Sequence, residues 1–246
     1  MNELMEAQPG FDMSKPAAVF SQSSIEVDGF PILYGEAGQG DALVCLQDGG
    51  LRLSKAHELM AQRRHLIAFE TPGVGRPLTR ATSLTDLVHK MHAAVSSIGI
   101  DRFSIMANSY AAELALRMAI AQPKQVQAVV LLAPAAIRTE RLAPRISSEM
   151  GAAMHPAAAS DDEFEVSLAN LETPVLALIG TDNHVTSSAA VQVYRDKLRN
   201  FHLVMVYGTG DAMDAERPEA VAALVDDFLT RGESFIVRNK SDIIYP

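Results

Sequence analysis

The sequence has few of the residues that a disulfide-rich protein or a protein that binds a polyanion needs. Its 246 residues include one cysteine and no tryptophan, and 21 Lys and Arg stand against 30 Asp and Glu, for a net charge of −9. One cysteine cannot form an internal disulfide, and Cys45 lies in the apolar run 42–46, which predicts a small buried hydrophobe. The acidic balance, with basic pairs no longer than Arg63-Arg64, excludes a nucleic acid as partner.

Long apolar runs are also missing. No stretch approaches the roughly 20 residues of a membrane-spanning helix, and the acidic residues 1–6 lead into no apolar segment of the secretory type. We therefore expect a cytoplasmic protein with no membrane partner. No histidine pair has zinc-ligand spacing, and the segment 208–210 lacks the third glycine and the strand–turn–helix setting of a dinucleotide site. We therefore expect no metal and no cofactor.

The chain does contain a regular alternation of short apolar runs and amphipathic stretches. Continuously apolar strands that alternate with helices are typical of a mostly parallel sheet covered on both faces, so we expect one α/β domain over residues 21–231. We expect a flexible tail at 1–20, irregular structure at 135–172, and a C-terminal extension at 232–246 that adds an edge strand or docks on a neighbouring copy. The expected strands are 25–27, 30–34, 42–46, 65–70, 103–106, 128–133, 174–180 and 203–207, and the expected helices are 55–63, 83–98, 110–121, 188–198 and 218–231.

Several motifs follow one another in an order that is typical of one family. The segment 70–77, Glu-Thr-Pro-Gly-Val-Gly-Arg-Pro, is similar to the turn D-x-P-G-x-G-x-S, with Glu70 for Asp and Pro77 for Ser. Residues 103–112, Phe-Ser-Ile-Met-Ala-Asn-Ser-Tyr-Ala-Ala, lie where the family has G-x-S-x-G-G. The segment 208–219 is similar to G-H-x-x-x-x-E-x-P-E. From about residue 25 to residue 231, the chain resembles the α/β-hydrolase fold superfamily.

The resemblance implies a fold and a place for the chemistry. The implied fold is the α/β-hydrolase fold, with a mostly parallel central sheet, helices on both faces and a short lid after the sixth strand, at 135–172. Ser109 falls at the position of the nucleophile, on a sharp strand-to-helix turn that needs small neighbours. Both flanking glycines of the motif are alanine here, at Ala107 and Ala111. The alternative is a purely structural role, in which Ser109 only caps the helix that begins at Tyr110.

The resemblance also implies an oxyanion hole made of backbone N–H groups. One belongs to the residue after the nucleophile, Tyr110, and the other to the loop after the third strand, at Gly49 or Gly50. Asp48 falls where relatives have a histidine, so this pocket carries a carboxylate that opposes a developing oxyanion unless it points away. Backbone donors do not depend on side-chain identity, so the hole can persist.

The catalytic triad of the family is incomplete. Asp211 stands at the position of the histidine, and Asn183 stands at the position of the acid, with Asp182 one residue earlier. Two carboxylates a few ångströms apart cannot both ionise cheaply, so Asn183 beside Asp211 is a compensating pair of changes. An aspartate is a weak base for a serine hydroxyl near neutral pH, so ordinary hydrolysis is expected to be weak or absent.

His184 is the candidate for an alternative base, because it follows Asn183 on the loop after the seventh strand. Its other interpretation is a solvated loop histidine. Three hypotheses follow: a serine hydrolase acting on a small ester, amide or C–C bond, an inactive hydrolase-fold protein that binds a small molecule or a protein, and a lyase that uses Asp211. The expected partner is a small-molecule ligand or substrate, and a homo-oligomer is possible.

Overall fold

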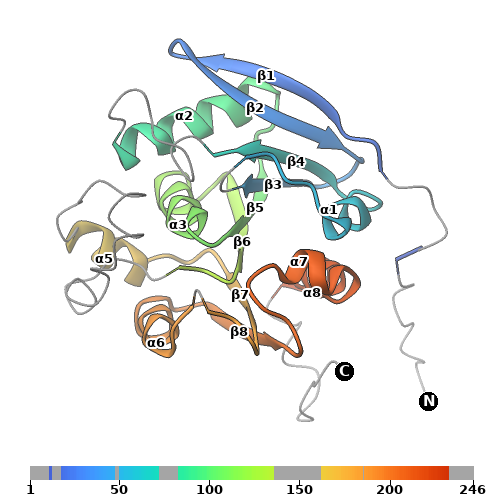
Figure 1. Cartoon of the computed structure of the whole chain (residues 1–246). Helices are drawn as coiled ribbons and strands as arrows, with labels where there is room; N and C mark the ends of the chain where they lie inside the picture. Colours follow the sequence, from blue (N-terminus) through green and yellow to red (C-terminus); the bar gives the residue numbers. More distant parts are fainter. Residues whose placement is uncertain are drawn as a thin grey trace, which may run out of the picture.

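A computed structural model describes residues 11–12, 18–47, 50–71, 83–135, 162–184 and 186–232 (Figure 1). Within these residues the centre is an eight-stranded sheet in the order β1-β2-β4-β3-β5-β6-β7-β8. Strand β2 is antiparallel to both of its neighbours, and the remaining pairs are parallel. The mostly parallel sheet is therefore confirmed. The strands are β1 (Ser21–Val27), β2 (Phe30–Ala37), β3 (Ala42–Gln47), β4 (His65–Glu70), β5 (Phe103–Asn108), β6 (Val126–Leu132), β7 (Val175–Gly180) and β8 (Phe201–Val206).

Helices cover both faces of the sheet (Figure 1). Alternate residues of a strand point to opposite faces, so each strand feeds two cores. In β3, for example, Val44 and Leu46 belong to one core, whereas Leu43 and Cys45 belong to the other. Cys45 is fully buried, as its apolar surroundings predict. The first core holds α2 (Leu84–Ser97), α3 (Ala111–Ala121), α5 (Asp162–Ala169) and α6 (Ser188–Lys197), and the second holds α1 (Lys55–Met60), α7 (Met213–Glu216) and α8 (Pro218–Arg231).

Local sequence signals set several element ends. The Ser83 hydroxyl accepts the Asp86 N–H at 3.0 Å, and the Asp86 carboxylate accepts the Ser83 N–H at 3.2 Å, which is a capping box at the start of α2. Asp28 and Gly29 both have positive φ, 52° and 73°, and turn β1 into β2. Pro218 stands in the first turn of α8, where its missing N–H costs nothing.

Two short helices, α5 and α7, are not among the helices that the sequence predicts. Helix α5 lies inside the segment 135–172, where we expected no regular structure. Its apolar spacing is weak, but Phe164 and Leu168 are buried in the first core, and the Arg117 guanidinium lies 3.8 Å from the centre of the Phe164 ring. Tertiary packing therefore stabilises a helix that the local pattern does not predict.

Several sequence expectations fall outside the described residues. They concern the remainder of the lid at 136–161, the extension at 233–246, and most of the tail. No helix of the described ranges is both long enough and apolar enough to cross a membrane.

A buried ion pair ties α8 to the turn between α1 and β4. Arg64 donates to Asp226 Oδ1 from Nε at 3.0 Å and from Nη2 at 2.7 Å, and Nη2 also donates to Thr230 Oγ1 at 2.8 Å. Arg63 donates to Asp226 Oδ2 at 2.8 Å. The side chains of Arg64 and Asp226 are only 8% and 7% exposed, so each charge depends on the other for compensation. Because α8 follows the loop after β8, this pair also positions that loop.

We expect Asp226→Asn to lower the free energy of unfolding by about 3–5 kcal/mol, because the change leaves a buried guanidinium without its counter-charge. Urea denaturation at pH 7 measures the loss. The matched control is Asp28→Asn, because Asp28 is 79% exposed in its 3.2 Å pair with Lys90 and should contribute about 1 kcal/mol or less. Equal losses in the two variants would contradict the role of the buried pair.

Candidate active site

Ser109 stands between β5 and α3 with a backbone φ of 46°, in the left-handed region that non-glycine residues rarely adopt. Its N–H donates to Leu132 O of β6 at 3.0 Å, and its carbonyl accepts the N–H of Ala135 at 3.0 Å. The flanking Ala107 and Ala111 are buried to 1% and 0% exposure, so their methyl groups fit where the family pattern has glycine. The serine is therefore presented on a sharp turn whose backbone is fixed from β6.

The segment after β6 is itself braced by α6 and by the loop before it. The Tyr194 hydroxyl donates to Ala135 O at 2.7 Å, and the Thr186 hydroxyl donates to Pro134 O at 2.9 Å. Burial raises the pKa of the Tyr194 phenol, with a smaller contribution from Glu113, so the hydroxyl stays a donor. These bonds support the residues that in turn fix Ser109.

The residues expected to form the oxyanion hole lie at the carboxyl ends of β3 and β5. Tyr110 follows Ser109 with φ −73° and ψ −20° and leads into α3. Gly50 has φ 111°, and nothing lies within 4 Å of the place where a side chain would begin. Asp48 and Gly49 lie outside the described residues. Strands β3 and β5 are direct neighbours in the sheet, so both expected donor positions belong to the same edge.

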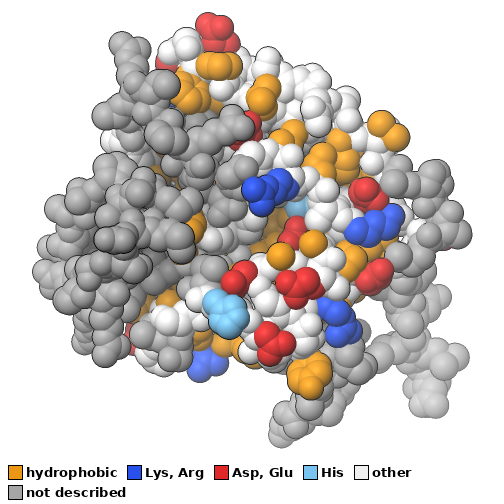
Figure 2. Space-filling model, in the orientation of Figure 1, with side chains coloured by type: hydrophobic (Ala, Val, Ile, Leu, Met, Phe, Trp, Pro, Cys, Tyr) orange, Lys and Arg blue, Asp and Glu red, His pale blue; other side chains and the backbone are white. Residues whose placement is uncertain are grey.

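The Asp211 carboxylate binds a backbone N–H group of the loop after β7. Its Oδ1 accepts the N–H of His184 at 2.9 Å, and Asp182 N donates to Thr209 O at 2.9 Å. The loops after β7 and β8 are thus joined side by side. The side chains of Asp182 and His184 are exposed, whereas Asp211 is half-buried. Figure 2 shows red acidic side chains and a pale-blue histidine close together on the face of the molecule that this view presents.

Asn183 does not form the pair with Asp211 that the sequence suggests. Its Oδ1 accepts the N–H of Thr186 at 2.7 Å, and its Nδ2 donates to Gly180 O at 3.2 Å. The amide therefore shapes its own loop, as asparagine does in turns, and Asp211 binds the same loop at the next residue, His184.

Among the described residues, neither the Ser109 hydroxyl nor the His184 imidazole makes a hydrogen bond. The structure thus places the candidate residues on neighbouring loops of one sheet edge, without joining Ser109 to a base. Among these same residues, no group of three or more His, Cys, Asp or Glu side chains is placed to hold a metal ion.

Sequence reasoning missed a buried polar group at the same edge. His57 of α1 is 1% exposed, and its two ring nitrogens contact Gln47 and Ser54. Burial lowers the pKa of His57, and the carboxylate of Asp214 partly opposes this effect. The hydroxyl of Thr71, just after β4, is also buried and has no hydrogen-bond partner among the described residues. The only available signal was a histidine two residues into an expected helix.

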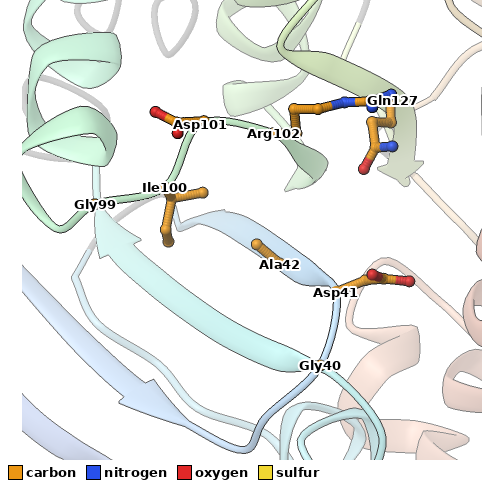
Figure 3. Close-up of a pocket in the computed structure, with 8 residues that line it drawn as sticks. All are labelled: Gly40, Asp41, Ala42, Gly99, Ile100, Asp101, Arg102 and Gln127. Carbon is orange, nitrogen blue, oxygen red and sulfur yellow. The ribbon is translucent and has the colours of Figure 1, made fainter.

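A separate hollow of about 380 Å³ lies at the opposite edge, at the amino ends of β3, β5 and β6. In Figure 3 the Arg102 side chain extends toward Gln127, whereas Asp101 points away from both. Because parallel strands run from this edge toward Ser109, the hollow lies apart from the candidate active site.

Comparison with known proteins shows the fold of this chain, through solved structures of low sequence identity. No protein-family model matches the sequence, and no curated protein sequence does. Solved structures match over most of the chain. A serine hydrolase from the bacterium Cycloclasticus zankles has a TM-score of 0.69 at 15% identity, over 87% of this chain and 99% of its own. A bacterial membrane phospholipase A has a TM-score of 0.68 at 20% identity, over 86% of each chain. A meta-cleavage product hydrolase has a TM-score of 0.68 at 15% identity, over 85% of this chain and 98% of its own.

The close approach of the loop at Thr209 and Gly210 to Gly180, the last residue of β7, gives a testable prediction. A Cβ at Gly180 would lie 2.2 Å from Thr209 O and 2.4 Å from Gly210 O, so we expect Gly180→Ala to displace the loop that carries Asp211. The expected loss of unfolding free energy is about 1–3 kcal/mol, because overpacking forces the backbone to shift. Urea denaturation measures the loss, and hydrogen exchange of the His184 amide reports the displaced loop.

Gly35→Ala in β2 is the matched control for this measurement. A Cβ there would have Leu51 and Leu53 side-chain atoms at 3.4 and 3.5 Å, which is ordinary contact. If the two alanine variants were equally stable and the His184 amide exchanged at the wild-type rate in both, this close approach would not constrain the loop.

Proposed function

We propose, from the premise that this chain has the α/β-hydrolase fold, that it is a serine hydrolase of low activity. Ser109 is the nucleophile, and the substrate is a small molecule with an ester, amide or cleavable C–C bond. The family's histidine and acid are replaced by Asp211 and Asn183, so turnover is slow. A hydrolase that loses its triad histidine loses a factor of about 10⁶ in turnover but retains roughly 10³–10⁴ over water.

The backbone of Ser109 is the observation that carries this proposal. A left-handed non-glycine residue costs on the order of 1–3 kcal/mol and persists only where its surroundings enforce it. A serine that merely caps a helix has extended backbone and needs no such strain, as Ser83 shows with φ −69° and ψ 159°. Ser109 differs from that pattern, and its hydroxyl caps no helix N–H among the described residues. The strain therefore favours presentation of the hydroxyl to a ligand.

The proposed reaction follows from the groups at this edge. Ser109 Oγ adds to the carbonyl carbon of an ester while its proton passes to a base, for which we propose the imidazole of His184. Backbone N–H groups of Tyr110 and of the loop at Gly49–Gly50 stabilise the oxyanion. Collapse expels the alcohol, which takes the proton from the base, and leaves the acyl group on Oγ for hydrolysis by water. In the present conformation the exposed imidazole has to turn toward Ser109, which is a further reason for slow turnover.

A second candidate function is binding of a small molecule without turnover. The contacts of Asp211 with the His184 N–H and of Asn183 with the Thr186 N–H favour it, because both side chains serve loop structure. No observation at Asp211 favours the lyase hypothesis over these two.

Labelling with a fluorophosphonate probe separates the two candidates, because the probe modifies activated serines. We expect modification of Ser109, read by mass spectrometry of the peptide, that is abolished in Ser109→Ala and slowed at least tenfold in His184→Ala. Ser187→Ala, which removes a serine that caps α6, is the control and should label like the wild type. Absence of labelling in protein shown to be folded would reject the hydrolase proposal and leave ligand binding.

A gain of function provides an independent test. The double variant Asn183→Asp and Asp211→His restores the acid and the base of the family. We expect it to hydrolyse p-nitrophenyl acetate at least 10²-fold faster than the wild type, because general-base catalysis contributes typically 10²–10⁴. Adding Ser109→Ala should remove the gain. If the gain survived Ser109→Ala, the new histidine would be acting on water without the serine.

A further inference from the structure

We infer that His57 is a positioning residue that holds both ends of the connection between β3 and α1, and with it the backbone donors beside Ser109. The inference rests on the proposed function, since the donors matter only if Ser109 receives a carbonyl group. It concerns a residue that lies outside the triad positions and the oxyanion-hole positions of the family pattern.

The two ring nitrogens of His57 reach opposite ends of the connection. Nε2 lies 2.9 Å from Nε2 of the Gln47 carboxamide, at the last residue of β3. Nδ1 accepts the N–H of Ser54 at 3.1 Å and lies 2.7 Å from the Ser54 hydroxyl, directly before α1. One rigid ring thus bridges residues 47 and 54, and the expected oxyanion donors Gly49 and Gly50 lie between them. Opening of this loop would break hydrogen bonds inside the core.

The contacts require a ring nitrogen that can accept a hydrogen bond. Nδ1 accepts the Ser54 N–H, and Nε2 faces the amide nitrogen of Gln47. A neutral imidazole has one acceptor nitrogen, whereas a protonated ring has none. Protonation of the ring therefore leaves the Ser54 N–H without its partner, so the Ser54 end is held by a neutral histidine.

The surroundings of His57 maintain this neutral form. The ring is 1% exposed, and burial lowers its pKa, an effect that Asp214 of α7 opposes from 3.9 Å. Three other titratable groups, from β3, α1 and α8, are neutral or paired. Cys45 of β3 is a neutral thiol because burial, and then Asp214, raises its pKa; Glu58 binds Lys55; and Asp226 of α8 binds Arg63 and Arg64.

The bridge is connected to the strand that carries Ser109. Gln47 follows Leu46, which pairs with Ala107 of β5, two residues before Ser109. Gln47 O also accepts the N–H of Thr71 at 2.9 Å, so the same residue joins β3 to the end of β4. The two ends of the connection, at Gln47 and Ser54, are therefore both held in position relative to the strand that carries the nucleophile.

Hydrogen exchange of the Ser54 amide tests the bridge directly. In His57→Leu, which keeps the volume and removes the acceptor, we expect this amide to exchange at least tenfold faster while amides of β5 and β7 keep their rates. In His57→Gln, whose side-chain oxygen can accept the N–H, we expect part of the protection to return. The control is His92→Leu, because His92 is a partly buried histidine of α2 that bonds Met118 O away from this loop.

The pH dependence of the unmodified protein gives a measurement that needs no variant. The ordinary pKa of histidine is about 6.5, and the pKa of His57 is lowered, so its stabilising contribution is complete above pH 6.5 and is lost as the pH falls. By nitrogen-15 NMR we expect His57 to stay neutral as the pH falls below 6.5, because burial lowers its pKa. Protonation of the ring at or above pH 6.5 would overturn the inference.

The labelling rate of Ser109 links the bridge to function. We expect His57→Leu to slow fluorophosphonate labelling at least tenfold and His92→Leu to leave it unchanged. An unchanged Ser54 amide in folded His57→Leu, or equal acceleration of all amides, would overturn the inference. If the wild-type Ser109 is never labelled, the proposed hydrolase function fails alone, because exchange and NMR still decide whether His57 holds the connection.

Discussion

The left-handed backbone of Ser109 is the constraint on which the candidate site depends. A strained residue relaxes unless its neighbours prevent it, and here the restraint comes from β6 through Leu132 O and from the segment after it through Ala135 N–H. That segment carries a second strained residue, Ala133 with φ 41°, and is supported in turn by Tyr194 and Thr186. The serine is thus fixed by hydrogen bonds and packing around it, whatever base accompanies it.

Much of the fold follows from patterns that are local in the sequence. The apolar runs of β3, β5 and β7 and the amphipathic spacing of α2 and α8 predict buried strands alternating with helices, and the sheet confirms them. Helix α5 could not be predicted in this way, because Phe164 and Leu168 become a helix face only when the first core is present to receive them. The same limit applies to α7, whose four residues hold a single buried side chain, Met213.

In the candidate site, the sequence predicts the positions of the residues but not their contacts. Ser109, Asp211 and Asn183 could be placed by their order relative to the strands, because the carboxyl ends of parallel strands meet at one edge. Their contacts could not be predicted, since Asn183 bonds within its own loop and Asp211 bonds a backbone N–H that any residue at 184 except proline would provide. The contacts of His57 could not be predicted from the sequence, for a different reason. Its partners Gln47 and Asp214 stand 10 and 157 positions away. The packing of α1 on β3 brings Gln47 to the ring, and the packing of α1 against α7 brings Asp214.

The ion pair between α8 and the turn that joins α1 to β4 has a consequence for how the chain is made. Arg64 and Asp226 are separated by 162 residues, so the arginine leaves the ribosome long before its carboxylate exists. Domains tend to fold from the N-terminus during synthesis, but this face cannot close until helix α8 has emerged. A nascent chain stopped before residue 226 therefore carries Arg63 and Arg64 without the carboxylate that neutralises them, on a face whose core still lacks α8.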